Sequence, residues 1–476
     1  MLTIAAESLG SARFRADYGI RYAYIAGAMY KGIASKEMVA ALGAAGLMGY
    51  LGTGGLERSQ IEQSIDYIQQ RIGAGAYGVN LLCNPERPEL EEDAVELFLQ
   101  RRVRNVEAAS FIHVSPSLVR YRLTGARCNA GGGVEVANRV LAKVSRCEVA
   151  ARFLQPSPTE IVEGLVAAGR LTAEEARLSR QVPLADAICV ESDSGGHTDR
   201  GVALTLLPVM LALRDQMQAR FQYRDPIHVG AAGGIGTPRA AVAAFAMGAD
   251  FVLTGSINQC TVEAGTSEAA KDLLQCVGVH ETVHAPAGDL FELGAKVQVM
   301  KRGVLFPARA NKLYELYQRH QCLEEIDAKT RALIEEKFFG RTFEEVWRET
   351  QEYWGRRDPA RALQIEASPR LRMAQVFKWY FVHSTRLAMR GEPDQQVNYQ
   401  IQCGPALGSF NEWVKGSSLE SWRARHVAEL GERIMRGAAE LFGSLLQSMH
   451  DRSTTYARAA ASPRVDLIHT TSGRYT

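Results

Sequence analysis

Three glycine-rich segments each follow a short apolar run in the chain. They are SDSGGH at 192–197, AAGGIGTP at 231–238 and TGS at 254–256. Glycine lets backbone amides approach an oxyanion closely, and a helix that begins at Pro238 would add its positive N-terminal end. We therefore expect Gly233, Gly234, Gly255 and Ser256 to bind a phosphate monoester, with ligand-free tight turns as the alternative.

His197 ends the first of these segments. An imidazole titrates near neutral pH, so this side chain could donate a proton or polarise a carbonyl. A loop histidine that contacts only solvent or backbone is the alternative.

Two earlier segments could hold a flat heterocycle. Gly27, Ala28 and Met29 follow the first apolar run and leave the backbone unhindered, so an aromatic ring could lie there. Asn80, in the segment GVN, both donates and accepts hydrogen bonds, which suits the polar edge of a flavin pyrimidine.

Two other motifs match well-known patterns in the wrong context. GAGAYG at 73–78 fits the dinucleotide fingerprint, but a helical pattern precedes it and a strand-like run comes after it. HETVH at 280–284 fits a zinc-protease motif, yet Gly278 and Pro286 flank a short β-branched segment in place of a long helix. We expect neither a Rossmann site nor a metal site.

The elements that must position these residues alternate along the first part of the chain. Apolar runs predict strands at 22–26, 47–51, 77–82, 108–112, 140–144, 187–191, 227–231 and 251–254. Apolar positions three and four apart predict helices at 35–45, 61–72, 88–99, 159–168, 204–217 and 238–247. Eight such units predict a (β/α)8 TIM barrel over residues 1–285, with an open doubly wound sheet as the structural alternative. The glycine segments would then come after the sixth, seventh and eighth strands, at the face where barrels bind ligands.

The pattern changes after the barrel. Residues 286–450 are mainly helical by their spacing, so an additional C-terminal helical subdomain is expected, acting as a lid, a carrier docking site or a dimer interface. Residues 451–476 are polar and aperiodic, which predicts a flexible tail.

Composition excludes several classes of protein. The 476 residues are 46% hydrophobic and 23% charged with a net charge of +2, which is typical of a globular chain with no overall field for nucleic acid. The eight cysteines are widely spaced and predict reduced thiols. We find neither a signal peptide nor a long apolar run, so a cytoplasmic protein without membrane contact is expected.

Several longer segments resemble one enzyme family. SDSGGH, AAGGIGTP and GVN are similar to FMN-binding barrels that include nitronate monooxygenases and FMN-type enoyl reductases. YAYIAGAMYKGIAS, VLAKVSRCEVAARFLQP, APAGDLFELGAKVQVMKRGVLFPARANKLYELY and YQIQCGPALGSFNEWVKGSSLE resemble the PfaD family, the trans-acting enoyl reductases of polyketide and polyunsaturated fatty acid synthases. This similarity runs from about residue 8 to about residue 445.

The resemblance implies a reaction and its residues. It implies FMN, reduced by NADPH or NADH, and an enoyl thioester delivered by an acyl carrier protein. The implied catalytic residue is His197. The expected cofactor contacts are Gly27, Ala28, Met29, Asn80, Lys143, Glu191, Gly195, Gly196, Gly233, Gly234, Gly255 and Ser256.

The chain departs from these patterns at three positions. Glu191 stands where nitronate monooxygenases tend to have glutamine, which disfavours nitronate chemistry. Gln402 and Asn398 stand where the PfaD pattern has tryptophan and aspartate, and we expect them to affect local packing or partner contacts more than the flavin site. A nitronate monooxygenase and a non-catalytic flavoprotein subunit of a synthase are the alternative functions.

Overall fold

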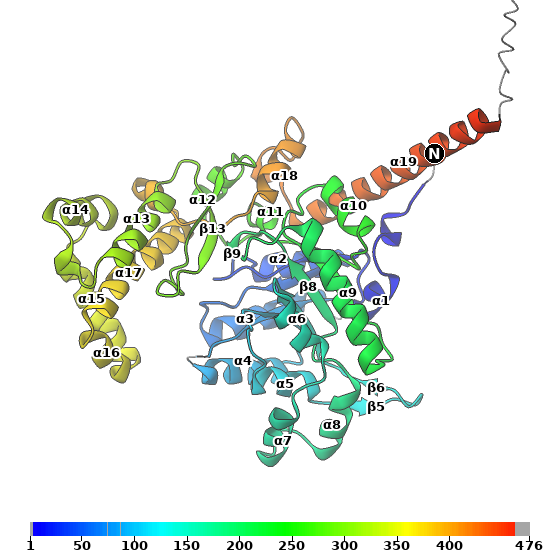
Figure 1. Ribbon diagram of the computed structural model, residues 1–476, viewed down its shortest axis with the longest axis horizontal. Helices are drawn as coiled ribbons and strands as arrows, with labels where there is room; N and C mark the ends of the chain where they lie inside the picture. The colour runs from blue at the N-terminus through cyan, green and yellow to red at the C-terminus, as the bar shows by residue number, and fades with distance from the viewer. Residues whose placement is uncertain (1–2, 74, 86, 462–476) are drawn as a thin grey trace, which may run out of the picture.

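A closed parallel barrel of eight strands forms the centre of the protein, and a helical lobe projects from it (Figure 1). The computed structural model describes residues 3–73, 75–85 and 87–461. The strand order around the barrel is β1-β11-β10-β8-β7-β4-β3-β2. These strands are β1 (Tyr24–Ala26), β2 (Met48–Leu51), β3 (Gly78–Leu82), β4 (Asn105–Ala109), β7 (Arg139–Val144), β8 (Ala187–Glu191), β10 (His228–Ala232) and β11 (Val252–Thr254). The predicted TIM barrel is confirmed.

Each of the eight predicted runs overlaps a barrel strand, and the largest shift is at β4. The apolar run predicts a strand from residue 108, whereas the strand begins at Asn105. Asn105 and Glu107 are both buried within it. An apolar run therefore could not mark the beginning of this strand.

Helices cover the outside of the barrel (Figure 1). They are α2 (Lys36–Ala44), α3 (Arg58–Ile72), α4 (Pro88–Gln100), α5 (Pro116–Leu123), α6 (Cys147–Leu154), α7 (Thr159–Ala167), α8 (Ala173–Leu178), α9 (Ala203–Phe221) and α10 (Pro238–Ala246). Several begin at a hydroxyl cap; Thr237, for example, accepts the backbone N–H of Ala240 at the start of α10. A two-stranded hairpin, β5 (Arg127–Cys128) and β6 (Val134–Glu135), precedes β7.

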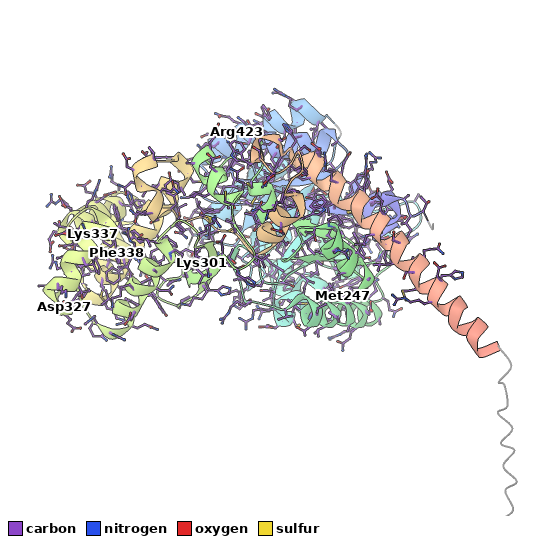
Figure 2. The ribbon with its side chains drawn as sticks, turned by 90° about the horizontal axis from the view of Figure 1, so that it is seen from above. Met247, Lys301, Asp327, Lys337, Phe338 and Arg423 are labelled. Atoms are coloured by element: carbon purple, nitrogen blue, oxygen red, sulfur yellow. The ribbon has the colours of Figure 1, made fainter. Side chains whose placement is uncertain are left out.

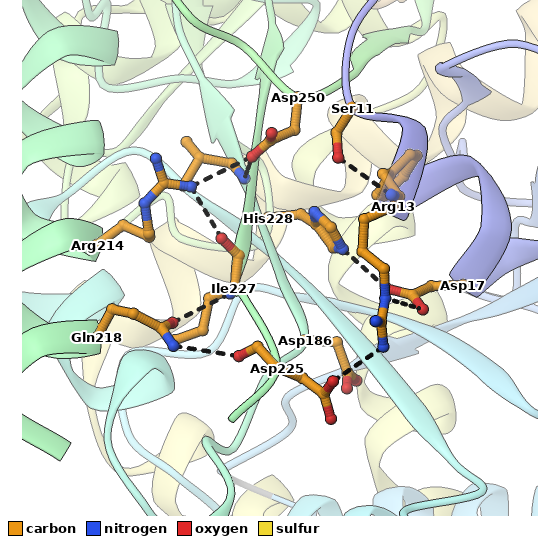
Figure 3. Close-up of polar contacts among 12 residues, drawn as sticks. Ser11, Arg13, Asp17, Asp186, Arg214, Gln218, Asp225, Ile227, His228 and Asp250 are labelled. Atoms are coloured by element: carbon orange, nitrogen blue, oxygen red, sulfur yellow. Dashed lines mark hydrogen bonds and ion pairs between the residues drawn. The ribbon is translucent and has the colours of Figure 1, made fainter. Parts of the chain in front are cut away.

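Helix α1 (Ala12–Tyr18) packs at the N-terminal end of the barrel strands. The Phe14 ring stacks on Phe251, with ring centroids 4.2 Å apart. Asp17 pairs with the buried His228 at 3.0 Å, and Arg13 bridges Asp17 and Asp225 (Figure 3). Chemistry in TIM barrels occurs at the opposite face, so we assign this network to stability.

The chain leaves the barrel after β11. Helices α11 (Ser256–Gln259) and α12 (Glu268–Leu274) lead to the hairpin β12 (Thr282–Pro286) and β13 (Lys296–Met300). Strand β13 also pairs with β9 (Gly196–His197), so the hairpin is joined to the loop that comes after β8. The helical lobe, residues 282–398, then continues with α13 (Phe306–Arg319), α14 (Ala328–Leu333), α15 (Phe343–Arg357), α16 (Pro359–Glu366) and α17 (Pro369–Arg390).

The lobe has its own aromatic core. Phe291, from the β12–β13 turn, contacts the rings of Tyr314, Tyr317, Phe377 and Phe381. Figure 2 shows Asp327, Lys337 and Phe338 in the lobe and Met247 on the barrel, at opposite sides of the view. The lobe is therefore a second packed unit beside the barrel.

The returning segment, residues 399–461, carries the chain from the lobe back to the barrel. It contains α18 (Ala406–Val414) and α19 (Val427–Ala461). Val427, Leu430 and Ile434 belong to the main barrel core. Residues 286–450, expected as one helical subdomain, are thus divided between the two units, because the chain returns to the barrel.

Helix α19 extends to Ala461, so the beginning of the segment expected as a flexible tail is helical. Residues 462–476 of that expected tail lie outside the described residues. All eight cysteines are free thiols. Within the described ranges, no helix has the length and hydrophobicity needed to span a membrane.

Candidate active site

Four polar side chains lie near the carboxyl ends of neighbouring barrel strands. They are Asn80 on β3, Glu107 on β4, Lys143 on β7 and Glu191 on β8. Strand pairing sets Asn80 beside Glu107 in the parallel register, and the Asn80 side chain donates to the Glu107 carbonyl at 3.0 Å. These side chains form a polar floor at the face where TIM barrels bind ligands.

Charges within this floor are held close together. The Lys143 Nζ atom lies 3.2 Å from Glu191 and 3.7 Å from Glu107, whose side chain is 1% exposed. Burial would lower the pKa of Lys143, but the two carboxylates outweigh it and raise that pKa. Burial raises the pKa of Glu107, and Lys143 opposes this shift. One ammonium group between two carboxylates therefore stays protonated.

Glu107 also anchors the loop after β1. Its Oε2 atom accepts the backbone N–H of Ala28 at 3.0 Å, while its buried Oε1 atom has no hydrogen-bond partner in the described part of the chain. Gly27 donates to the Thr254 carbonyl at 2.9 Å, and the Met29 carbonyl lies against Gly52. The backbone at 27–29 is thus fixed by β4 and β11, and a Cβ atom at Gly27 would lie 2.6 Å from the Leu253 side chain.

The glycines predicted to bind phosphate are in two different environments. A side chain at Gly233 would meet the Ser192 carbonyl group at 2.8 Å, so this glycine serves the packing of two loops. At Gly234 and Gly255, nothing lies within 4 Å of the Cβ position. Ser256 accepts the backbone N–H of Gly404 at 2.9 Å, which leaves its hydroxyl hydrogen free to donate. Gly234, Gly255 and Ser256 can therefore accept an anion.

Gly195 and Gly196 face the returning segment. A Cβ atom at Gly195 would lie 2.7 Å from the Cys403 Cα atom, and one at Gly196 would lie 3.0 Å from the Gln402 side chain. Gln402 also forms a β-bridge with Val299 on β13. Gln402, expected to affect local packing or partner contacts more than the flavin site, thus lies in a segment that crosses the loop carrying His197.

His197 is held by an acid from the lobe. Its Nε2 atom lies 3.0 Å from the carboxylate of Asp289, in the turn between β12 and β13. This hydrogen bond raises the pKa of His197, and burial opposes the shift only in part. The imidazole is half-exposed, so it can exchange protons with solvent.

The HETVH segment lies in a turn and a strand and not in a helix. His284 is on β12 and contacts Asp193 at 3.3 Å, while Gln298 on β13 donates to the same carboxylate at 3.1 Å. Asp193 belongs to the SDSGGH segment. His284 therefore helps to join the hairpin to this loop.

The lobe also reaches the loop after β1. Burial is the main cause that raises the pKa of Tyr30 to about 12, and the nearby Asp289 adds to this shift. A hydrogen bond with Thr385 of α17 opposes it. Burial lowers the pKa of Lys31, and Arg386 of α17 adds to this effect. One end of α17 therefore lies near the loop after β1.

Three residues of the site, Glu107, Asp289 and Tyr30, were missing from the sequence prediction. Glu107 is a buried acid inside a buried strand, and the acid is visible in the segment NVEAA. Asp289 and Tyr30 approach the mouth of the barrel together only through the packing of the lobe, so no local pattern could identify them.

Comparisons with known proteins support the same arrangement. Residues 15–287 match the family model of nitronate monooxygenases, and residues 320–399 match that of the inserted helical domain of acyl-carrier-protein S-malonyltransferases. Polyketide biosynthesis protein PksE of Bacillus subtilis is 54% identical over 451 residues, which cover 94% of this chain and 58% of PksE. A polyunsaturated fatty acid synthase protein of Thraustochytrium sp. is 40% identical over 440 residues, covering 91% of this chain and 29% of that protein. The chain thus spans less than two thirds of either relative.

A solved structure has the same fold over nearly the whole chain. It is the enoyl reductase domain of MlnA from the macrolactin biosynthesis cluster of Bacillus amyloliquefaciens. The TM-score is 0.90 at 43% identity, and the similarity covers 93% of this chain and 100% of that domain. Barrel, lobe and returning segment are therefore shared features.

Proposed function

Because the chain belongs to the nitronate monooxygenase family, and within it to the PfaD-like enoyl reductases of polyketide and polyunsaturated fatty acid synthases, we propose that it is a trans-acting, FMN-dependent enoyl reductase. The family consists of flavin-dependent oxidoreductases. The proposed reaction saturates the α,β double bond of an enoyl thioester on an acyl carrier protein and consumes NADPH or NADH.

The observation that carries this proposal is the pairing of a polar floor with open glycines. Gly234 and Gly255 come after adjacent strands and leave room for an anion. Lys143 and Asn80 lie on the floor, where a cation and an amide suit the polar edge of a flavin. The Oε1 atom of Glu107, which accepts no hydrogen bond among the described residues and lies 3.7 Å from the Lys143 ammonium, is a further polar group that a bound ring could approach.

Each of these residues has a definite role in the proposed reaction. Gly234, Gly255 and Ser256 hold the phosphate of FMN, and Asn80 and Lys143 orient its ring. Bound FMN supplies hydride transfer from the nicotinamide to the β-carbon of the thioester. His197 holds the proton that the α-carbon receives. A positive charge at His197 also favours the enolate-like transition state.

The carrier protein would dock beside α17. This helix contains five basic residues and no acidic residue. Two of the five, Arg386 and Arg390, are exposed and form no ion pair within the described residues. Carrier proteins are acidic, so complementary charge would bring the phosphopantetheine arm to the neighbouring mouth.

Purified protein tests the proposal directly. The released cofactor is identified by mass spectrometry, and the protein is then mixed anaerobically with NADPH or NADH and a crotonyl thioester on a carrier protein. Thioester-dependent oxidation of the nicotinamide with a butyryl product is expected. A folded, flavin-loaded protein without this reaction would refute the proposal. Oxygen consumption with a nitronate would then indicate a nitronate monooxygenase, and no turnover of either kind would indicate a non-catalytic flavoprotein.

A further inference from the structure

Within the described residues, the lobe contacts the loop that carries His197 at three points. Strand β9 pairs with β13, where His197 is opposite Val297. Asp193 of the same loop is held by His284 and Gln298 of the hairpin. The third contact joins the His197 Nε2 atom to the Asp289 carboxylate at 3.0 Å. Only this third contact involves the functional atoms of the imidazole.

We infer that Asp289 is a positioning residue of the active site. Its carboxylate accepts a hydrogen bond from the Nε2–H group of His197 and thereby leaves the Nδ1–H group to protonate the substrate. This inference rests on the proposed enoyl reduction and assigns its proton donor to one ring atom. It also assigns a chemical role to the lobe, because Asp289 belongs to the lobe and His197 to the barrel.

Packing fixes Asp289 within its turn. A Cβ atom at the preceding Gly288 would lie 2.7 Å from Phe381 on α17, so the turn lies directly on this helix. The Lys378 Nζ atom, also on α17, lies 3.3 Å from the Asp289 carbonyl and 2.9 Å from Glu292. The backbone of the turn is thus held against α17, and a carboxylate on a fixed turn can set the orientation of an imidazole.

The charges around His197 favour its protonated form. The hydrogen bond to Asp289 is the largest influence and raises the pKa of His197, and Glu191 of β8 adds to it. Burial alone would raise the pKa of Asp289, but the hydrogen bond from His197 lowers it overall. The nearby cations are engaged elsewhere: Lys378 pairs with Glu292, and Lys296 of β13 lies 4.8 Å from the ring centre of Tyr314. Burial lowers the pKa of Lys296, and Arg200, on the loop after His197, lowers it further.

Atoms and electrons balance in the proton transfer. When hydride reaches the β-carbon, the π electrons of the double bond move to the α-carbon and the thioester carbonyl. The Nδ1–H bond of the imidazolium breaks and a C–H bond forms at the α-carbon. His197 is left as a neutral imidazole with its remaining proton on Nε2, shared with Asp289, and solvent restores the proton on Nδ1.

Two variants of Asp289 test the inference. Asp289→Asn removes the charge and Asp289→Glu retains it. The pKa of His197 is measured by NMR titration of labelled histidine, with His197→Ala to assign the signal. Loss of the carboxylate should lower this pKa, so less imidazolium remains as pH rises. Near pH ~8 the asparagine variant should lose about tenfold of its thioester reduction rate for each unit by which the pKa of His197 falls, and much less near pH ~6. The glutamate variant should recover most of the rate.

A neighbouring acid supplies the matched control. Glu292→Asp alters the same turn and keeps a carboxylate for Lys378, so it changes neither the charge around His197 nor the Asp289 side chain. It should leave the pH profile and the His197 signal unchanged. A purely structural role for Asp289 would instead lower the rate equally at every pH.

Three results would overturn the inference: an unchanged His197 pKa in Asp289→Asn, an unchanged pH profile, or a wild-type His197 pKa below the ordinary value. The last result needs no folded variant. Failure of the proposed function is distinguishable, because the wild-type protein would then reduce no enoyl thioester at any pH while the NMR titration still reports the contact.

Discussion

Gly255→Ala separates the binding of a ligand from the packing of the protein. The Cβ position at Gly255 is open, with no atom within 4 Å. The free energy of unfolding without cofactor should therefore change by less than about 0.5 kcal/mol. If the phosphate of FMN occupies this space, the new methyl group displaces it and removes at least one hydrogen bond to a charged group. Such a bond contributes about 1.5–3 kcal/mol, so the Kd for FMN should rise by about 10- to 150-fold.

Quenching of flavin fluorescence during titration of cofactor-free protein measures this Kd. Riboflavin, which has the same ring and no phosphate, is the control ligand, and its affinity should not change. Gly195→Ala is the control variant for packing. Its methyl group would lie 2.7 Å from the Cys403 backbone, so a loss of about 1–3 kcal/mol in unfolding free energy is expected from urea denaturation. Wild-type affinity of Gly255→Ala for FMN, or an equal loss for riboflavin, would refute the phosphate assignment.

Other predictions concern the proton donor, the floor and the carrier. His197→Ala should keep FMN but slow thioester reduction about 10²–10⁴-fold in stopped-flow assays, and full activity would exclude it as the donor. Lys143→Met should lower the unfolding free energy by about 3–5 kcal/mol because Glu107 loses its buried cation. Since the folded pKa of Glu107 is then raised further, this variant should lose stability as pH rises above about 4.3, and a second change, Glu107→Gln, should remove that pH dependence. Arg386→Glu with Arg390→Glu should raise KM for carrier-bound crotonyl thioester and leave KM for crotonyl pantetheine unchanged; an equal change for both would argue against docking there.

The fold was largely predictable because the barrel repeats one physical pattern. Each buried parallel strand is a short apolar run, and each covering helix has a single apolar stripe, so both periods are visible locally. The exception is β4, which contains the buried polar residues Asn105 and Glu107. Because Glu107 belongs to the polar floor, the apolar pattern of this strand is interrupted. Polar interruptions of a barrel strand are therefore informative in themselves.

The site was predictable only where its residues lie on a strand or directly after one. The strand fixes the position of Lys143 and of the glycine-rich loops, so their common location depends on the barrel alone. Asp289 contacts His197 although the two residues are 92 positions apart in the chain. Gln402 is placed beside the same loop by its bridge to Val299 on β13. No period or motif encodes such long-range contacts.

The same glycines show why the barrel cannot be considered apart from the returning segment. Gly195 and Gly236 have no room for a side chain because backbone of the returning segment, at Cys403 and Ala406, occupies that space. Ser256, next to the open Cβ position of Gly255, accepts a hydrogen bond from the backbone N–H of Gly404 in the same segment. Helix α19 then completes the outer core of the barrel. A chain ending near residue 285 would hence lack part of the barrel's core and the segment that packs on Gly195, Gly236 and Ser256, so the lobe is an excursion between two portions of a single barrel unit.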